Sequence, residues 1–219
     1  CVERAKALQP CELVIVDGGS ADNTVALASD AGADVITAPR GRAPQLNAGV
    51  AHATGDVLLF LHADTWLVAE AREQMELALA KSNVQVGAFA QAIAGRGVLY
   101  RWLERGNALR ARRWGLAYGD QGIFIRREFL MRHNGFPDVP IMEDLRLMRT
   151  LRRHTTLAML PGPLHVSARR WQRHGVIGQT MRNWLLLAAE RCGFSPHRLA
   201  RLYRPHADPG ETATPLLVR

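Results

Sequence analysis

The sequence predicts an α/β fold with a mixed, mainly parallel sheet flanked by helices. Its most informative stretch is residues 56–65, in which the five consecutive apolar residues 57–61 are too few for a helix. Such a run is typical of a strand buried on both faces of a parallel sheet. Three strand-and-helix units follow one another within about 80 residues, which is the spacing of right-handed βαβ connections.

Turn and cap residues divide the chain into these elements. Pro10 ends a first helix, and Gly32 and Gly55 end the next two. We predict strands at residues 12–16, 34–37, 57–61, 84–94, 122–126 and 155–160. We predict helices at residues 1–9, 24–31, 43–54, 68–81, 98–114, 127–133, 143–153, 176–191 and 196–203.

The chain of 219 residues is long enough for one domain with a sizeable core. We assign residues 1–204 to this domain, with a helical C-terminal part at about 175–204 and a basic loop at 167–174. Residues 205–219 contain three prolines and a glycine, which predicts a disordered tail. No apolar run approaches the roughly 18 residues of a membrane span.

The net charge of +8 comes almost wholly from arginine, since Lys6 and Lys81 are the only lysines. Such a surplus suits nucleic acid, anionic lipid or a phosphorylated substrate. Nucleic acid is the least supported, because no zinc finger or helix-turn-helix signature is present. The arginines of helix 98–114 are expected on a solvated face. Residues 176–187 are apolar with arginines nearby, which fits either a helix packed on the domain or a peripheral membrane contact.

The cysteines Cys1, Cys11 and Cys192 have no CxxC spacing and no even framework. Reduced thiols of this kind indicate a cytoplasmic protein.

Acidic residues follow two of the predicted strands. Asp17 and Asp64 end strands whose carboxyl ends meet at one edge of a parallel sheet, where ligands bind. Gly18 lets the backbone approach a ligand closely. Asp64, with His62 two residues before it, is a candidate ligand for Mg²⁺ or Mn²⁺. A turn role for Asp17 and a helix-capping role for Asp64 remain open.

Two further groups carry charge suited to a site. Glu143 and Asp144 begin a helix, where capping alone accounts for one carboxylate and the second indicates a site. Arg169, Arg170 and Trp171 combine paired guanidinium groups with an aromatic ring, which suits phosphate binding. A surface loop is the alternative for this group.

In order along the chain, three groups of motifs occur together. They are Asp17-Gly18-Gly19-Ser20, then Gln45-Leu46-Asn47 and His62-Ala63-Asp64-Thr65, then Gly119-Asp120-Gln121, Gly135-Phe136-Pro137 and Met142-Glu143-Asp144. This ordered set resembles the family 2 glycosyltransferases with the GT-A fold. The likeness is strongest to the bacterial subgroup of selenodomain-associated transferases 2.

The resemblance implies an inverting, metal-assisted transfer of a sugar from a nucleotide-sugar donor to an acceptor hydroxyl. It implies donor contacts from Asp17, Gly18, Arg42, Asn47 and Asp64. The remaining implied roles are catalysis by Asp144 with Glu143, a Mn²⁺ or Mg²⁺ ion at Asp64 and His62, and an acceptor or phosphate border made by Gly119, Asp120, Gln121, Arg170 and Trp171. The acceptor is unknown, and a lipid-linked one is compatible with the basic, apolar helix at 176–187.

Two features depart from the family pattern. His62 stands where the family has the first acid of its DxD motif. The family's first strand, central in its sheet, is absent here, so we expect an N-terminal truncation with unpaired strand edges. A nucleotidyltransferase and an impaired nucleotide-binding module remain the alternative functions.

Overall fold

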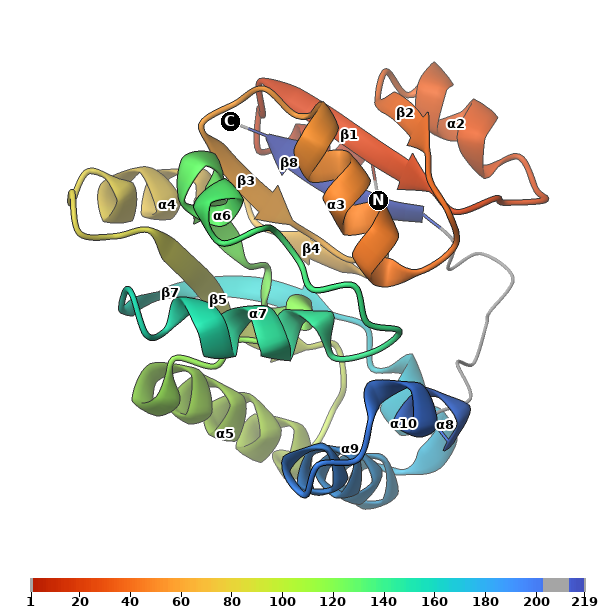
Figure 1. The fold of residues 1–219 in the computed structure, drawn as a ribbon, viewed down its shortest axis with the longest axis vertical. Coiled ribbons are helices and arrows are strands. Elements are labelled where there is room, and N and C mark those ends of the chain that lie inside the picture. The colour runs from red at the N-terminus through yellow and green to blue at the C-terminus, as the bar shows by residue number, and fades with distance from the viewer. Residues whose placement is uncertain (1, 203–212, 219) are drawn as a thin grey trace.

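A computed structural model describes residues 2–202 and 213–218, with the backbone alone at residues 170, 174 and 213–218. Within these residues, one eight-stranded sheet has the order β2-β1-β8-β3-β6-β5-β7-β4 (Figure 1). The strands are β1 (Glu12–Asp17), β2 (Asp34–Thr37), β3 (Val57–Phe60), β4 (Thr65–Leu67), β5 (Val86–Ile93), β6 (Phe124–Arg126), β7 (Leu157–Val166) and β8 (Ala213–Val218).

The helices surround this sheet. They are α1 (Val2–Lys6), α2 (Thr24–Asp30), α3 (Arg42–His52), α4 (Ala71–Leu79), α5 (Val98–Trp114), α6 (Arg127–Arg132), α7 (Glu143–Leu151), α8 (Arg169–His174), α9 (Val176–Arg191) and α10 (Pro196–Leu202), with a 3-10 helix η1 (Gly119–Gln121). No helix of the described ranges is long and apolar enough to cross a membrane.

The prediction of a mixed, mainly parallel sheet flanked by helices is confirmed. The pairings β1·β2 and β5·β7 are parallel, while β8, β6 and β4 pair antiparallel with their neighbours. Five of the eight described strands therefore point in one direction and three in the other. β1 and β3 point in the same direction, so their carboxyl ends lie at the same edge of the sheet, as the sequence predicts.

The core lies on both faces of the sheet, because side chains alternate along each strand. Leu58 and Phe60 of β3 join one apolar cluster with residues of α3 and α7. Leu59 and Leu61 join the other, with residues of α1 and α4. Figure 1 places α3, α6 and α7 together over the first of these faces. The run at 57–61 is thus buried on both sides.

The end of the sequence supplies a central strand. β8 lies between β1 and β3, paired with β1 from Glu12↔Val218 to Asp17↔Ala213 and with β3 from Leu58↔Val218 to Phe60↔Leu216 (Figure 1). The prediction of disorder is therefore wrong for residues 213–218, and residues 205–212 lie outside the described part. The strand edges that we expected to be unpaired are paired with this segment.

Three smaller differences have local causes. β4 was not predicted, because a strand of three residues gives too short a pattern. Trp66 of β4 stacks on His165 of β7, with 5.2 Å between the ring centroids. β7 continues six residues past the predicted end at Leu160, alongside β5 with a register shift between Phe89 and Gln91. The stretch predicted as a basic loop contains α8.

Candidate active site

Arg42 is the centre of the candidate site. It is the first residue of α3, and its Nε atom lies 2.9 Å from Oε1 of Glu143 at the start of α7. Its Nη2 atom lies 2.7 Å from Nε2 of His62, just after β3. Because a guanidinium only donates hydrogen bonds, His62 Nε2 is the acceptor in this contact. One arginine thus joins the edge of the sheet to two helices.

Gly119 lies inside this group. A Cβ atom on it would stand 2.6 Å from Nε2 of His62, 2.8 Å from Nη2 of Arg42 and 3.2 Å from Oδ2 of Asp144. Only glycine leaves room for these three side chains to converge on the η1 backbone. The structure therefore brings together five predicted site residues: Arg42, His62, Gly119, Glu143 and Asp144.

Asp144 is held by the backbone on both oxygens. The amide of Gly119 donates to its Oδ2 atom at 2.5 Å, and the amide of Leu145 donates to its Oδ1 atom at 2.7 Å. A carboxylate oxygen can accept more than one hydrogen bond. The carboxylate is thus fixed in direction and keeps lone pairs with which it can accept a proton from a substrate hydroxyl.

Glu143 is fully buried beside Asp144. Met142 before it has a φ of 63°, the left-handed region that non-glycine residues rarely adopt, and such residues cluster at functional sites. Burial raises the pKa of Glu143 to about 7, against a lowering by Arg42 and with a further rise from Asp144. Its Oε2 atom has no hydrogen-bond partner among the described residues. Glu143 is thus placed to hold Arg42 rather than to meet solvent.

Asp17 is part of a tight turn. Its carboxylate accepts hydrogen bonds from the amide of Gly19 at 2.8 Å and from the amide and hydroxyl of Ser20, the latter at 2.5 Å. Burial raises the pKa of Asp17, but these hydrogen bonds outweigh it and the pKa lies below its ordinary value. Gln45 of α3 bonds Val16 O through Nε2 at 2.9 Å and lies against Gly18.

Asn47 has a structural role that the sequence did not indicate. Its Nδ2 atom donates to the carbonyl of Phe136 at 2.8 Å, and its Oδ1 atom accepts from the amide of Phe136 at 2.9 Å. Gly135 has a φ of 67°, and a Cβ on it would stand 2.7 Å from Asn47 Oδ1. The Asn47 amide therefore fastens the turn after α6 to α3, and the donor contact expected of it stays a prediction.

The described residues contain no group of three His, Cys, Asp or Glu that could hold a metal ion. Asp64 is partly exposed, and its carboxylate makes no hydrogen bond or ion pair with the described residues. His62 turns its Nε2 atom to Arg42. A divalent ion here would therefore have Asp64 as its protein ligand, and would complete its shell from phosphate oxygens and water, as Mg²⁺ and Mn²⁺ commonly do.

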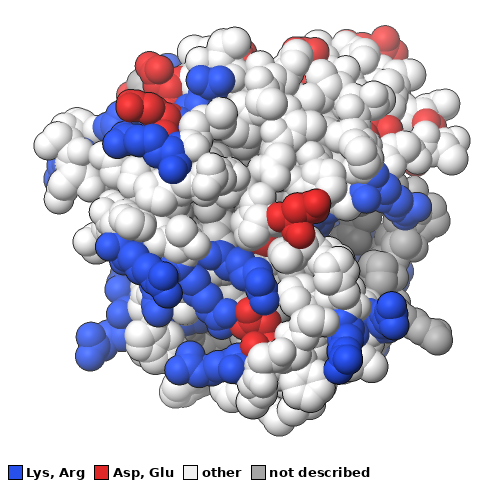
Figure 2. All heavy atoms as spheres, in the orientation of Figure 1, with Lys and Arg blue, Asp and Glu red and all other residues white. Residues whose placement is uncertain are grey.

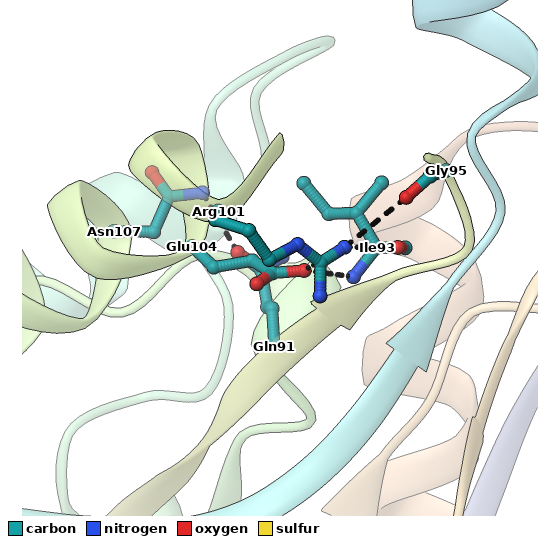
Figure 3. A network of polar contacts seen from close by, with 6 residues as sticks. All are labelled: Gln91, Ile93, Gly95, Arg101, Glu104 and Asn107. Carbon is teal, nitrogen blue, oxygen red and sulfur yellow. Dashed lines mark hydrogen bonds and ion pairs between the residues drawn. The ribbon is translucent and has the colours of Figure 1, made fainter. Parts of the chain in front are cut away.

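A polar network ties α5 to the end of β5 (Figure 3). Asn107 Nδ2 donates to Gln91 Oε1 at 2.7 Å, and Glu104 accepts from the amide of Ile93 at 2.5 Å. Arg101 pairs with Glu104 at 2.9 Å and donates to the carbonyl of Ile93 at 2.8 Å. Arg101 is thus not on a purely solvated face, contrary to the expectation for this helix.

The same network reaches η1, the predicted acceptor border. Gln91 Nε2 donates to the carbonyl of Asp120 at 2.9 Å, and Arg110 Nη2 donates to Oε1 of buried Gln121 at 2.7 Å. The Arg110 guanidinium also lies 3.5 Å from the ring centroid of Tyr118. Burial lowers the pKa of Arg110 and raises those of Tyr118 and Asp120.

Arg110 is the main residue that the sequence interpretation missed. Nothing in the sequence separates it from Arg112 and Arg113 on the same helix. The arginine and aromatic group at 169–171 lies apart from these contacts: Trp171 is edge-on to Tyr100 of α5 at 6.4 Å and packs against apolar clusters. The side chain of Arg170 lies outside the described part.

Solved structures similar to this chain include GT-A transferases, at identities that bear on the fold alone. TarS of S. aureus has 15% identity and a TM-score of 0.57, covering 76% of this chain and 55% of its own. Glucosyl-3-phosphoglycerate synthase of Mycobacterium tuberculosis has 19% identity and a TM-score of 0.52, covering 75% and 64%. The mannosyltransferase PcManGT of Pyrobaculum calidifontis has 22% identity and a TM-score of 0.55, covering 70% and 47%.

The fold is that of the GT-A glycosyltransferases, a class of α/β proteins. The family model for glycosyl transferase family 2 matches residues 1–140, and the chain belongs to that family. It spans between about half and two thirds of the length of the three solved structures above. A search of curated proteins finds no match.

Proposed function

We propose that this chain transfers a sugar from a nucleotide-sugar to an acceptor hydroxyl with inversion at the anomeric carbon. The observation that carries the proposal is the Asp144 carboxylate, oriented by two backbone amides beside the Arg42–Glu143 ion pair. A single displacement needs a base at the acceptor hydroxyl and positive charge at the leaving diphosphate. Asp144 and Arg42 supply these two groups within one cluster.

In this reaction Asp144 accepts the proton of the acceptor hydroxyl as its oxygen bonds to the anomeric carbon. The bond from that carbon to the diphosphate breaks, and the diphosphate leaves with the electron pair. Arg42 is held by Glu143 and His62, so its guanidinium needs little reorganisation to stabilise this charge. Asp17 and Gly18 in the turn after β1 are proposed to contact the nucleotide.

We infer that a Mn²⁺ or Mg²⁺ ion assists through Asp64. When bound, such an ion supplies positive charge to the leaving diphosphate. PcManGT was solved with GDP-Man and Mn²⁺, and TarS with UDP-GlcNAc, which motivates testing both nucleotide classes here. Family membership favours sugar transfer over the nucleotidyl transfer that the sequence left open. The likeness to the selenodomain-associated subgroup and a cytoplasmic location rest on sequence motifs and thiol usage.

The test is a screen of nucleotide-sugars with the purified chain, with and without Mn²⁺, paired with the variant Asp144→Asn. The variant keeps the size of the side chain and removes the base, so transfer should fall about 10²–10⁴-fold while nucleotide affinity stays unchanged. Calorimetric titration with UDP and GDP measures that affinity. Near-normal transfer by Asp144→Asn would rule out this carboxylate as the base. Absence of nucleotide binding by the unaltered chain would sink the proposed function.

A further inference from the structure

Helix α9 buries two polar residues and exposes several large apolar ones. Its buried residues are Gln179 and Glu190. Large apolar side chains lie exposed on its other side, at spacings of four, three and one that place them on one helix face. They are Ile177, Met181, Trp184 and Leu185. A surface helix of a globular protein normally buries its apolar stripe, so this inversion requires an explanation.

The inward face of α9 is fixed by charge. Glu190 pairs with Arg149 of α7 at 2.5 Å and with Arg146 at 3.2 Å, and Gln179 Nε2 donates to Asn183 Oδ1 at 2.9 Å. The two Glu190 ion pairs hold this side of the helix against α7, while the Gln179–Asn183 hydrogen bond lies within α9. The exposure of Trp184, 65% of its surface, is therefore a property of how α9 is anchored.

The first turns of α5 extend this apolar surface. Tyr100 and Leu103 of α5 share a cluster with Trp171 of α8 and Val176 of α9, so the beginnings of α5 and α9 adjoin. Around that cluster, α5 exposes Val98, Leu99 and Trp102. We name these three residues, together with Ile177, Met181, Trp184 and Leu185, the α5–α9 face. Exposed large apolar side chains that gather on adjoining helices can mark an interaction site.

The charges around the α5–α9 face are mostly positive; Glu104 of α5 and Glu190 of α9 are each paired with arginine. No aspartate or glutamate stands in the sequence between Asp144 and Glu190, a stretch that contains eight arginines: Arg146, Arg149, Arg152, Arg153, Arg169, Arg170, Arg173 and Arg182. Figure 2 shows basic side chains gathered over α5 and α7, the two helices that adjoin α9. Such a positive border around an apolar face complements anionic lipid headgroups.

We propose that the α5–α9 face docks on an anionic lipid bilayer. Two tryptophans among large aliphatic side chains, bordered by arginine, are the composition of an interfacial helix surface. The apolar side chains enter the headgroup region and the arginines pair with lipid phosphates. Because Glu190 joins α9 to α7, docking holds Asp144 at a set position relative to the bilayer surface. Binding of the α5–α9 face to a bilayer does not require sugar transfer, so the two can be tested separately.

The experiment is co-sedimentation of the full chain with vesicles of phosphatidylglycerol and phosphatidylcholine, and with vesicles of phosphatidylcholine alone. The chain should bind the first, bind the second at least about tenfold less, and be released from the first as salt screens the arginines. Ile177→Ser combined with Trp184→Ser should weaken binding at least about tenfold. Arg105→Gln, an exposed position one turn after Trp102, should weaken it about fivefold.

The matched control is Leu77→Ser on α4, which is 65% exposed and lies outside the α5–α9 face. It should bind as the unaltered chain does. Far-ultraviolet circular dichroism confirms that each variant is folded. Equal binding of the Ile177 and Trp184 double variant and the Leu77 control overturns the proposal. A second result also overturns it: the unaltered chain does not bind vesicles but is a dimer by light-scattering chromatography, and the double variant is a monomer. The α5–α9 face would then join two copies of the chain.

Discussion

Gly119 is the residue with the least room in the candidate site. The Cβ of Gly119→Ala would displace the ends of Arg42 and His62, both flexible side chains, rather than backbone. We therefore expect the fold to survive while transfer falls at least about tenfold, since small displacements of positioning groups are costly.

The control is Gly106→Ala in α5, where a Cβ meets nothing within 4 Å. This change should raise the free energy of unfolding by about 0.5–1 kcal/mol, because alanine favours a helix interior. Transfer assays and thermal melts of the two variants separate the effects. Full activity of Gly119→Ala would show that Arg42 and His62 need not converge on η1.

Glu143 makes stability depend on pH. Its pKa is about 7 in the folded chain, above the ordinary 4.5, so folding favours the protonated form. The resulting stability is fully present below about pH 4.5 and is lost as pH rises through about 7. The unaltered chain should lose up to about 3 kcal/mol over this range through Glu143. Glu143→Gln, which still offers Arg42 an acceptor, should lack that loss. Urea denaturation across the range measures both, and parallel pH curves would contradict the assignment.

The sequence predicted site residues that follow from local patterns, but not contacts between residues far apart in the chain. Asp17 and Asp64 could be placed at one edge because strand ends are local features and a parallel sheet aligns them. The contacts of Arg42 with His62 and Glu143 join residues 20 and about 100 positions apart, which no local pattern encodes. Asn47 was assigned to the donor, but the same amide chemistry suits the Phe136 backbone equally well.

At the scale of the elements, Glu190 anchors α9 to α7. Glu190 is 7% exposed and joins α9 to Arg146 and Arg149 of α7. Glu190→Gln removes the charge from both pairs, and we expect a loss of about 1–3 kcal/mol in unfolding free energy. Glu76→Gln, in an exposed pair with Arg72 at 2.9 Å, should cost less than about 0.5 kcal/mol. Denaturant titration compares them, and equal losses would mean that Glu190 does not anchor α9.

Helix and strand positions followed from the sequence wherever an apolar period was long or a glycine or proline marked an end. The first helix, the β1 and β3 strands and α5 are of this kind. β4 and α8 were missed because three to six residues carry too little periodicity. For α9 the sequence left two alternatives open, a helix packed on the domain and a peripheral membrane contact, because an apolar run alone does not show which way a helix turns its apolar side.

At the scale of the whole molecule, β8 joins the two parts of the sheet. It pairs with β1 on one side and β3 on the other. Removal of residues 213–219 should lower the free energy of unfolding by several kcal/mol, at roughly 0.5–1.5 kcal/mol for each backbone hydrogen bond lost. Amide exchange should quicken in β1 and β3.

A synthetic peptide of residues 213–219 added to the shortened chain should restore part of the lost stability, and a scrambled peptide should not. Unchanged exchange in β1 and β3 after the removal would contradict the pairing. The prediction of a disordered tail was wrong for residues 213–218 because the prolines and glycine of residues 205–219 are typical of loops. Pro215 pairs with Ile15 of β1 but lies one residue beyond the β8 segment that pairs with β3, so the proline, which lacks an amide hydrogen, has only one neighbouring strand.

This position of β8 sets an order of events during synthesis. The ribosome makes residues 213–218 after every other strand that the structure describes. Until then β1 and β2 have no partner that links them to β3, β6, β5, β7 and β4. Chains generally fold from the N-terminus as they emerge, at about 5–20 residues per second. We therefore expect β1 and β3 to lack their pairing with β8 until residues 213–218 have left the ribosome, which would delay closure of this sheet.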